Sequence, residues 1–324
     1  MTSRPIVVVT RRLPASVEAK LGELFDARLS PDDRALDAAA LQQAMRTADA
    51  LLCTVTDRLT AQVLSAEPRR VRILANFGVG FNHVDVDAAR KAGIVVTNTP
   101  DVLTDDTADL AVTLMLMVAR RTGEGERHVR DGDWTGWAPT QMLGTRVTGK
   151  TLGLIGLGRI GRAVAYRAVH GFGMRVLFYD PTPVPEDQVR ALGAERRDSI
   201  EAVLRESDFV SLHCPAMPET YHLLNAERLG QMKPGAFLIN TSRGDVVDES
   251  ALAEALCART IAGAALDVFE REPSVTPALL GMDNVVLLPH LGSATLETRV
   301  AMGERAIENL AAFFRGETPR DRVA

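Results

Sequence analysis

The sequence is poor in cysteine and has no run of basic residues, and both shortages exclude classes of protein. Its three cysteines, Cys53, Cys214 and Cys257, lie far apart without a CxxC pair, so neither a disulfide framework nor a zinc site is indicated. The formal net charge is −5, and no basic cluster offers the positive surface that binds nucleic acid or an anionic membrane. We therefore expect no metal, no nucleic-acid partner and no membrane partner.

Long apolar runs are also absent. The run Ile6–Val9 is too short for a signal peptide and is typical of a first strand, which favours the cytoplasm. The segment 110–119 is apolar on every side of a helix, but charged residues bound it and it is too short to cross a bilayer. A helix that is apolar all round is buried, and we expect this one at a subunit interface.

With 324 residues, 46% hydrophobic and 24% charged, the chain has the composition of an ordinary globular protein of about two domains. Strand-like and helix-like segments alternate, which predicts parallel sheets covered by helices. The expected strands are 6–9, 50–53, 71–76, 93–97, 151–155, 176–179, 209–213, 236–240, 261–266 and 285–288. The expected helices are 15–24, 36–44, 61–64, 85–92, 110–119, 162–169 and 294–314.

A glycine-rich turn follows the strand at 151–155. It has the sequence Gly156-Leu157-Gly158-Arg159-Ile160-Gly161 and precedes a helix-like segment. In a dinucleotide-binding unit, the first glycine permits a tight turn, the second lets the backbone approach the pyrophosphate, and the third lets helix and strand pack closely. The next strand ends in Asp180, 19 residues after Gly161 (180 − 161 = 19), where a carboxylate accepts hydrogen bonds from a ribose diol.

Asp180 also favours NAD(H) over NADP(H). Its carboxylate repels a 2′-phosphate, and the segment Pro181–Pro185 has no Arg or Lys to bind one. The alternative interpretation is that Asp180 only ends a strand before a proline-rich turn.

The segment Gly144–Thr151 matches the P-loop pattern GxxxxGK[ST]. A P-loop follows a strand and opens a helix. Here residues 139–143 are not strand-like, and an apolar strand follows Lys150. Because this order is reversed, ATP or GTP binding is not expected.

Three motifs in the second half of the chain offer a cation, a carboxylate and an imidazole. Arg243 lies in INTSRG, Glu272 in LDVFEREP and His290 in LPHLGSAT. Each follows the carboxyl end of a predicted strand, where ligands bind in open α/β sheets. Each residue alone is also explained as an ordinary surface or loop residue, so the weight lies in their joint occurrence.

Together, these motifs resemble those of the D-isomer-specific 2-hydroxyacid dehydrogenases. The similarity extends over residues 76–295 and includes the spacings from Arg243 to Glu272 (272 − 243 = 29) and from Glu272 to His290 (290 − 272 = 18). Within the family, the segment Trp137–Gly149 is most similar to glyoxylate and hydroxypyruvate reductases (D-glycerate dehydrogenases).

The resemblance implies that Arg243 binds the substrate carboxylate and the reacting oxygen. It makes His290 the acid/base, with Glu272 orienting the ring and favouring its protonated form. These roles fit the chemistry, because reduction of a carbonyl leaves an alkoxide that needs a proton donor and a nearby positive charge. Imidazole donates near neutral pH, and a guanidinium binds two carboxylate oxygens in one plane.

The resemblance also implies binding contacts. The backbone N–H groups of Val79 and Gly80 are expected to hold the substrate carboxylate, and Ser293 to contact a substrate hydroxyl. Asp267 is expected to bind the nicotinamide amide. The full set of expected cofactor-binding residues is Gly156, Gly158, Arg159, Ile160, Gly161, Asp180, Thr107, Pro215, Thr241 and Asp267.

With the alternating pattern, the resemblance predicts an α/β protein of two doubly wound parallel-sheet domains. A flavodoxin-like substrate domain is expected over residues 1–99 and 293–324, and a Rossmann NAD-binding domain over residues 100–292. Within the latter, residues 103–149 are expected to supply a dimerisation helix and an arm. The part 122–149 is polar and Gly-rich, which favours an extended arm or loop.

The expected function is NADH-dependent reduction of glyoxylate to glycolate and of hydroxypyruvate to D-glycerate by a cytoplasmic homodimer. In this family, the enzymes that act on formate carry Gln at the position of Glu272, and those that act on phosphoglycerate carry arginines near the positions of Thr54 and Thr56. Because this sequence has neither feature, formate and phosphorylated substrates are not expected. Another D-2-hydroxyacid dehydrogenase, of the D-lactate or phosphoglycerate type, is one alternative. A non-catalytic NAD-sensing interaction protein is the other, and the intact catalytic set argues against it.

Overall fold

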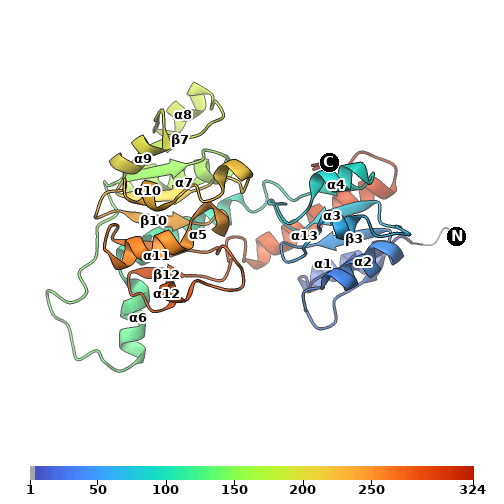
Figure 1. The fold of residues 1–324 in the computed structure, drawn as a ribbon, viewed down its shortest axis with the longest axis horizontal. Helices are drawn as coiled ribbons and strands as arrows, with labels where there is room; N and C mark the ends of the chain where they lie inside the picture. The colour runs from blue at the N-terminus through green and yellow to red at the C-terminus, as the bar shows by residue number, and fades with distance from the viewer. Residues whose placement is uncertain (1–3) are drawn as a thin grey trace. The chain divides into compact units, whose positions relative to one another are not determined.

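The computed structural model describes residues 4–324, which divide into two compact units. Unit 1 comprises the described residues up to Leu103 together with Ser293–Ala324, and unit 2 is Thr104–Gly292. The blue start and the red end of the chain in Figure 1 therefore belong to the same unit. The expected boundary at residue 99 lies four residues before Leu103, and within unit 1 Thr298 Oγ1 donates a hydrogen bond to the carbonyl of Val102 (3.4 Å).

Unit 1 is built on a five-stranded sheet in the order β2-β1-β3-β4-β5, in which all neighbours are parallel. This is the flavodoxin-like order. The strands are β1 (Ile6–Val9), β2 (Asp26–Arg28), β3 (Ala50–Cys53), β4 (Ile73–Asn76) and β5 (Val95–Thr97). The helices are α1 (Ala15–Leu24), α2 (Ala38–Thr47), α3 (Ala61–Leu64), α4 (Val86–Lys91) and α13 (Leu296–Phe314).

Local chemistry explains where these elements begin. The helix predicted at 36–44 starts at Ala38, because the Asp37 side chain caps it by accepting a hydrogen bond from Ala40 N (2.8 Å). The strand predicted at 93–97 starts at Val95, because Gly93 has a φ of +68° and cannot continue a strand. The strand β2 was not predicted, since three partly exposed residues carry no apolar pattern.

Unit 2 contains a seven-stranded parallel sheet in the order β12-β11-β10-β9-β6-β7-β8, the doubly wound Rossmann arrangement with one strand added. The strands are β6 (Thr151–Ile155), β7 (Arg175–Tyr179), β8 (Ala194–Arg196), β9 (Phe209–Leu212), β10 (Phe237–Asn240), β11 (Gly263–Leu266) and β12 (Val285–Leu287). The α-helices are α5 (Thr104–Ala119), α6 (Thr122–Arg130), α7 (Arg159–Phe172), α8 (Glu186–Leu192), α9 (Ile200–Glu206), α10 (Ala226–Leu229), α11 (Glu249–Cys257) and α12 (Pro277–Leu280). Two short 3-10 helices are η1 (Pro218–Thr220) and η2 (Gly244–Val246).

The apolar helix expected at 110–119 is part of α5, which packs on α7 and on β10, β11 and β12 of its own unit. Leu114 and Met115 are buried against this sheet. Leu116 and Met117 are only half-buried and Thr113 is exposed, so within the described chain the helix is not buried on every side. Its place at a subunit interface stays a prediction.

The arm predicted at 122–149 begins with a helix, α6, and only the remainder lacks helix and strand. The green α6 projects from the layers of unit 2 in Figure 1, and none of its residues is buried. Charged side chains explain why this segment is helical. Arg130 pairs with Glu126 one turn away, and the acidic Glu124 in the first turn and the basic residues in the last turn interact favourably with the helix dipole. Apolar periodicity could not indicate this helix, because it has no apolar face.

None of the helices in residues 4–324 is both long enough and apolar enough to cross a membrane.

A buried ion pair holds the end of the chain on α13 in unit 1. Arg305 donates two hydrogen bonds to Asp321 (2.6 and 2.9 Å), and Asn309 donates a third (3.0 Å).

Asp321→Ala removes the partner of the Arg305 guanidinium, whose side chain is only 13% exposed. The free energy of unfolding should fall by about 2 kcal/mol or more, measured by urea unfolding. The exposed pair Arg315–Glu317 provides the control, and Glu317→Ala should change stability little. Equal small losses in both variants would contradict the prediction.

Candidate active site

The predicted site residues of unit 2 follow the carboxyl ends of its strands. Gly156 comes directly after β6, Asp180 after β7, Thr241 after β10 and Asp267 after β11, while His290 lies three residues beyond β12. Because all these strands are parallel, their carboxyl ends meet at one edge of the sheet. Ligands bind at this edge in doubly wound folds.

The glycine turn has the geometry of a dinucleotide-binding loop. Gly156 has a φ of +97°, and a Cβ there would lie 2.8 Å from the His213 carbonyl. A Cβ at Gly161 would lie 2.4 Å from the oxygen of Gly156, whereas one at Gly158 meets no atom within 4 Å. The turn is therefore closed at the outer glycines and open at the middle one, where α7 begins without a side-chain cap. This is where a phosphate approaches the helix N-terminus.

The Asp180 carboxylate is bound to the glycine turn. Its Oδ2 accepts a hydrogen bond from Leu157 N (2.8 Å) and its Oδ1 one from Thr182 N (2.9 Å). An arginine also lies here: Arg196, at the end of β8, donates to the Asp180 carbonyl (3.0 Å). Arg196 lies 16 residues after Asp180 in the sequence, outside the segment 181–185. It comes close to Asp180 because β8 pairs with β7.

The remaining predicted cofactor residues differ in surroundings. The Thr241 hydroxyl is buried and, among residues 4–324, has no hydrogen-bond partner, which fits a polar ligand at this point. Thr107 is buried and donates to the Gly292 carbonyl (3.0 Å). Pro215 is exposed. Arg159 and Ile160 form the first turn of α7, exposed and half-buried respectively. An open glycine turn and an unsatisfied hydroxyl at the same edge of the sheet together fit a dinucleotide.

Asp267 holds the loop that carries His290. Its side chain is buried, and its two oxygens accept hydrogen bonds from Leu291 N (2.6 Å) and Gly292 N (2.8 Å). Its carbonyl accepts one from His290 N (2.8 Å). Burial raises the pKa of Asp267, although the N–H groups of Leu291 and Gly292 act against that rise. His290 itself has a φ of +56°, a conformation uncommon for a side-chain-bearing residue, so these bonds stabilise an unusual backbone.

His290 and Glu272 form a hydrogen-bonded pair. The His290 Nδ1 lies 2.9 Å from Glu272 Oε2, and the side chains are 30% and 35% exposed. Burial raises the pKa of Glu272, but the hydrogen bond and charge of His290, the Phe269 N–H and Arg243 outweigh it and hold the pKa below its ordinary value. An ionised carboxylate only accepts hydrogen bonds, so Nδ1 donates and Nε2 is left to exchange protons with a ligand.

Arg243 belongs to the same charge cluster. It is half-buried after β10, where Asn240 Nδ2 donates to its carbonyl (2.9 Å) and its own Nη1 donates to Ser242 O (2.6 Å). Burial lowers the pKa of Arg243, and the charges of Glu272 and Asp245 act in the opposite direction. The structure thus brings together the cation, the carboxylate and the imidazole that the sequence placed 47 residues apart (290 − 243 = 47).

Two further residues at this edge, His213 and Glu249, lie in sequence contexts that indicated no function. His213 follows β9, lies against Gly156 and is 2.9 Å from Ser211 Oγ through its Nε2. Burial lowers the pKa of His213 to about 4, so the ring is neutral near pH 7. Glu249, the first residue of α11, is buried and bonded to the loop that contains Glu272. The one feature of the sequence that could have indicated a role for Glu249 is its position at the start of a helix that follows a strand.

In unit 1, Val79 and Gly80 lie in the loop after β4 and are half-buried. Side-chain amides hold the carbonyls of this loop: Asn76 donates to Gly78 O and Gly80 O, and Asn98 donates to Val79 O, each at 2.9 Å. The loop backbone is therefore ordered by its carbonyls. Ser293 begins the second segment of unit 1 and is half-buried. The substrate contacts of Val79, Gly80 and Ser293 stay predictions.

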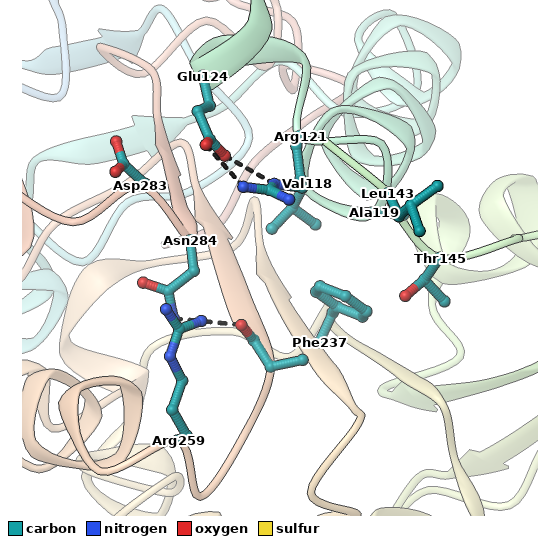
Figure 2. A pocket seen from close by; sticks show the side chains of 12 residues that line it. Val118, Ala119, Arg121, Glu124, Leu143, Thr145, Phe237, Arg259, Asp283 and Asn284 are labelled. Carbon is teal, nitrogen blue, oxygen red and sulfur yellow. Dashed lines mark hydrogen bonds and ion pairs between the residues drawn. The ribbon is translucent and has the colours of Figure 1, made fainter. Parts of the chain in front are cut away.

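A hollow of about 290 Å³ lies at the opposite end of the unit 2 sheet (Figure 2). Phe237 begins β10, and Ala262 and Asn284 precede β11 and β12, so its walls come from the amino ends of the strands. Figure 2 shows Arg121 and Glu124 turned toward each other, and they are joined by hydrogen bonds of 2.6 and 2.7 Å. This hollow is separate from the candidate site, because its paired charges lie away from the carboxyl edge.

The P-loop-like segment and the cysteines have no corresponding site. Gly144 lines this hollow, and Lys150 leads directly into β6 without opening a helix. Among residues 4–324, no group of three or more His, Cys, Asp or Glu side chains is arranged to hold a metal ion.

Comparison with known proteins agrees with this geometry. The family model of the D-isomer specific 2-hydroxyacid dehydrogenase, NAD binding domain, matches residues 112–292. A glyoxylate reductase from Thermococcus litoralis is 46% identical over 324 residues, covering 99% of this chain and 97% of that protein.

Two solved structures are similar over nearly the whole chain. The TT0316 protein from Thermus thermophilus has a TM-score of 0.90 and 44% identity, covering 98% of this chain and 100% of its own. An NADPH-dependent glyoxylate/hydroxypyruvate reductase from Sinorhizobium meliloti has a TM-score of 0.86 and 39% identity, covering 99% of this chain and 98% of its own. With its two doubly wound domains, its glycine turn and these full-length relatives, the chain belongs to the D-isomer specific 2-hydroxyacid dehydrogenase family.

Proposed function

We propose that this chain is an NADH-preferring reductase of small 2-keto acids, which converts glyoxylate to glycolate and hydroxypyruvate to D-glycerate. The observation that carries the proposal is the Glu272–His290 hydrogen bond within the charge field of Arg243, at the same sheet edge as the glycine turn. The names of the relatives in T. litoralis and S. meliloti support the substrate class. The Asp180 carboxylate at the turn supports NADH.

The glycine turn, Asp180 and Thr241 would hold the dinucleotide through the backbone of α7, the ribose hydroxyls and the unsatisfied Thr241 hydroxyl. When bound, the nicotinamide cofactor supplies a hydride equivalent to the substrate carbonyl. Nicotinamide binding by Asp267 stays a prediction, because both of its oxygens already accept hydrogen bonds from the His290 loop.

The three charged side chains then divide the work on the substrate. The Arg243 guanidinium binds the carboxylate of the 2-keto acid and stabilises negative charge on its reacting oxygen. His290 Nε2 donates the proton that this oxygen needs. Glu272 accepts from Nδ1–H, which fixes the ring plane and stabilises the positive charge of the ring before the proton leaves.

A homodimer is part of the proposal. Three large apolar side chains of the arm are exposed: Trp134 (53%), Trp137 (82%) and Leu143 (67%). Exposed apolar and aromatic side chains gathered in one segment mark a protein–protein contact. We propose that this segment, with the half-buried face of α5, contacts a second copy of the chain. Location in the cytoplasm stays a prediction.

A spectrophotometric assay tests the function. Initial rates are measured with NADH and with NADPH against glyoxylate, hydroxypyruvate, pyruvate, phenylpyruvate and 3-phosphohydroxypyruvate. We expect fast NADH oxidation with the first two substrates and slow or no oxidation with the others. No turnover with any substrate, despite clear NADH binding, would favour a non-catalytic NAD-sensing protein.

His290→Ala should lower kcat by about 10²- to 10⁴-fold, the usual contribution of a general acid, with NADH affinity by fluorescence titration unchanged. Glu272→Gln keeps the shape of the side chain but removes the charge that favours a protonated ring, so the alkaline limb of the pH profile of kcat should move to lower pH. A His290→Ala enzyme with wild-type turnover would remove His290 from the mechanism.

Asp180→Asn should relax the preference for NADH over NADPH by about tenfold, the size of one hydrogen bond to a charged group. The amide keeps an oxygen for Leu157 N but no longer repels a 2′-phosphate, and the nearby Arg196 is then able to bind one. The measurement is kcat/KM with each cofactor. Arg196→Ala in the Asp180→Asn background should reverse part of the gain. An unaltered preference would mean that Asp180 only ends a strand.

A further inference from the structure

We propose that Glu249 is a positioning residue of the active site, whose buried carboxylate fixes the loop 269–276 and thereby sets the Glu272–His290 hydrogen bond. The inference rests on the proposed function, since it concerns the same acid/base pair. Neither the motifs in the sequence nor the family resemblance assigns a role to Glu249.

Glu249 binds the loop on both sides of Glu272. Its side chain is on α11 and the residue is 4% exposed. Oε1 accepts a hydrogen bond from Glu270 N (2.6 Å), and Oε2 accepts from Thr276 Oγ1 (2.5 Å) and Thr276 N (3.3 Å). One oxygen thus holds the start of the loop and the other holds its end. Glu272 lies between these two points.

The hydrogen bonds that satisfy this buried carboxyl group come from the loop itself. A buried carboxylate is costly unless hydrogen bonds satisfy it. Within residues 4–324, Glu249 forms no ion pair with Lys or Arg, and its hydrogen bonds come from Glu270 and Thr276. The N-terminus of α11, where Glu249 is the first residue, adds a favourable dipole. The order of the loop and the burial of the Glu249 carboxyl group therefore depend on each other.

The start of the loop is closely packed. A Cβ at Gly244 would lie 1.8 Å from the Phe269 carbonyl carbon, so the Arg243 segment packs directly on the loop backbone. Phe269 N also donates to Glu272 Oε1 (3.1 Å). A displacement at Glu270 N thus reaches Glu272 through the adjacent residue, and it alters the distance from Glu272 to His290.

The test uses Glu249→Gln in the full-length protein. This change replaces one acceptor oxygen by an NH₂ group that faces N–H or O–H donors, while the volume stays the same. We expect kcat to fall by about tenfold to a hundredfold, as for a catalytic group displaced by a fraction of an ångström to an ångström. The affinity for NADH should not change, and the alkaline limb of the kcat profile should move to lower pH, as in Glu272→Gln.

A double-mutant comparison separates positioning from general damage. If Glu249 acts through Glu272, then Glu249→Gln added to Glu272→Gln should lower kcat little further, because the two effects are not independent. Thr276→Val removes one donor from the loop side and should change kcat and the pH profile in the same direction by a smaller factor, which keeps the test available if Glu249→Gln folds poorly.

Two controls lie on α11. Glu254→Gln removes an exposed charge from the same helix and should leave kcat and the pH profile unchanged. Leu252→Val removes a methylene from a fully buried side chain, so it should lower the melting temperature without moving the pH profile. It shows what a purely structural substitution on this helix does.

Hydrogen exchange gives a readout that does not need activity. The amides of residues 269–276 should exchange faster in Glu249→Gln than in the wild type, with other peptides of unit 2 unchanged. A variant with a lower melting temperature but unaltered loop exchange and pH profile would overturn the inference while the function stands. If the wild type reduces no 2-keto acid, the proposed function fails, and loop exchange still decides for or against positioning by Glu249.

Discussion

In unit 2, every strand of a seven-stranded sheet ends at the same edge, because all its neighbours are parallel. A parallel strand needs a crossover connection, so each strand end is also the start of a loop that leads away from the sheet. Residues separated by tens of positions are thereby placed side by side. The cation, the carboxylate, the imidazole and the glycine turn all lie at one edge of the sheet because of this single constraint.

Carboxylates order the loops that leave this edge, and two of the three, Asp267 and Glu249, are buried. Asp180 binds the glycine turn through Leu157 N, and Asp267 binds the His290 loop through two backbone N–H groups. Glu249 binds the loop of Glu272 in the same way. A carboxylate suits this purpose because its two oxygens accept from several N–H groups that no strand or helix satisfies. The loops that carry Glu272 and His290 are thus ordered by main-chain contacts to carboxylates.

The parts of the fold that could be predicted from the sequence are those with a local signal. The fully buried strands β3, β9 and β10 are mostly apolar, and the turn at Gly156 follows from the strand before it and the helix after it. Arg243, Glu272 and His290 were predicted as site residues because each follows a predicted strand and because together they match the motifs of the family. Their hydrogen bonds could not be foreseen, since register and side-chain direction depend on the assembled sheet.

Other elements had no local signal. The helix α6 is stabilised by charges and not by an apolar face, and β2 and β8 are three-residue edge strands with few buried side chains. Arg196 reaches Asp180 only through the pairing of β8 with β7. Glu249 is an ordinary acidic residue at a helix start until its partners at 270 and 276 fold back on it.

The return of α13 to unit 1 has a consequence for synthesis on the ribosome. Unit 2 is one continuous segment, and its synthesis is complete before Ser293 is added. Unit 1 begins the chain, yet its sheet packs against α13 and its last contacts include Asp321, three residues from the end. Domains generally fold as units while the chain is made. Here the later-made unit is therefore able to fold first, and the first hundred residues must wait, with the apolar face of their sheet uncovered, for the final thirty.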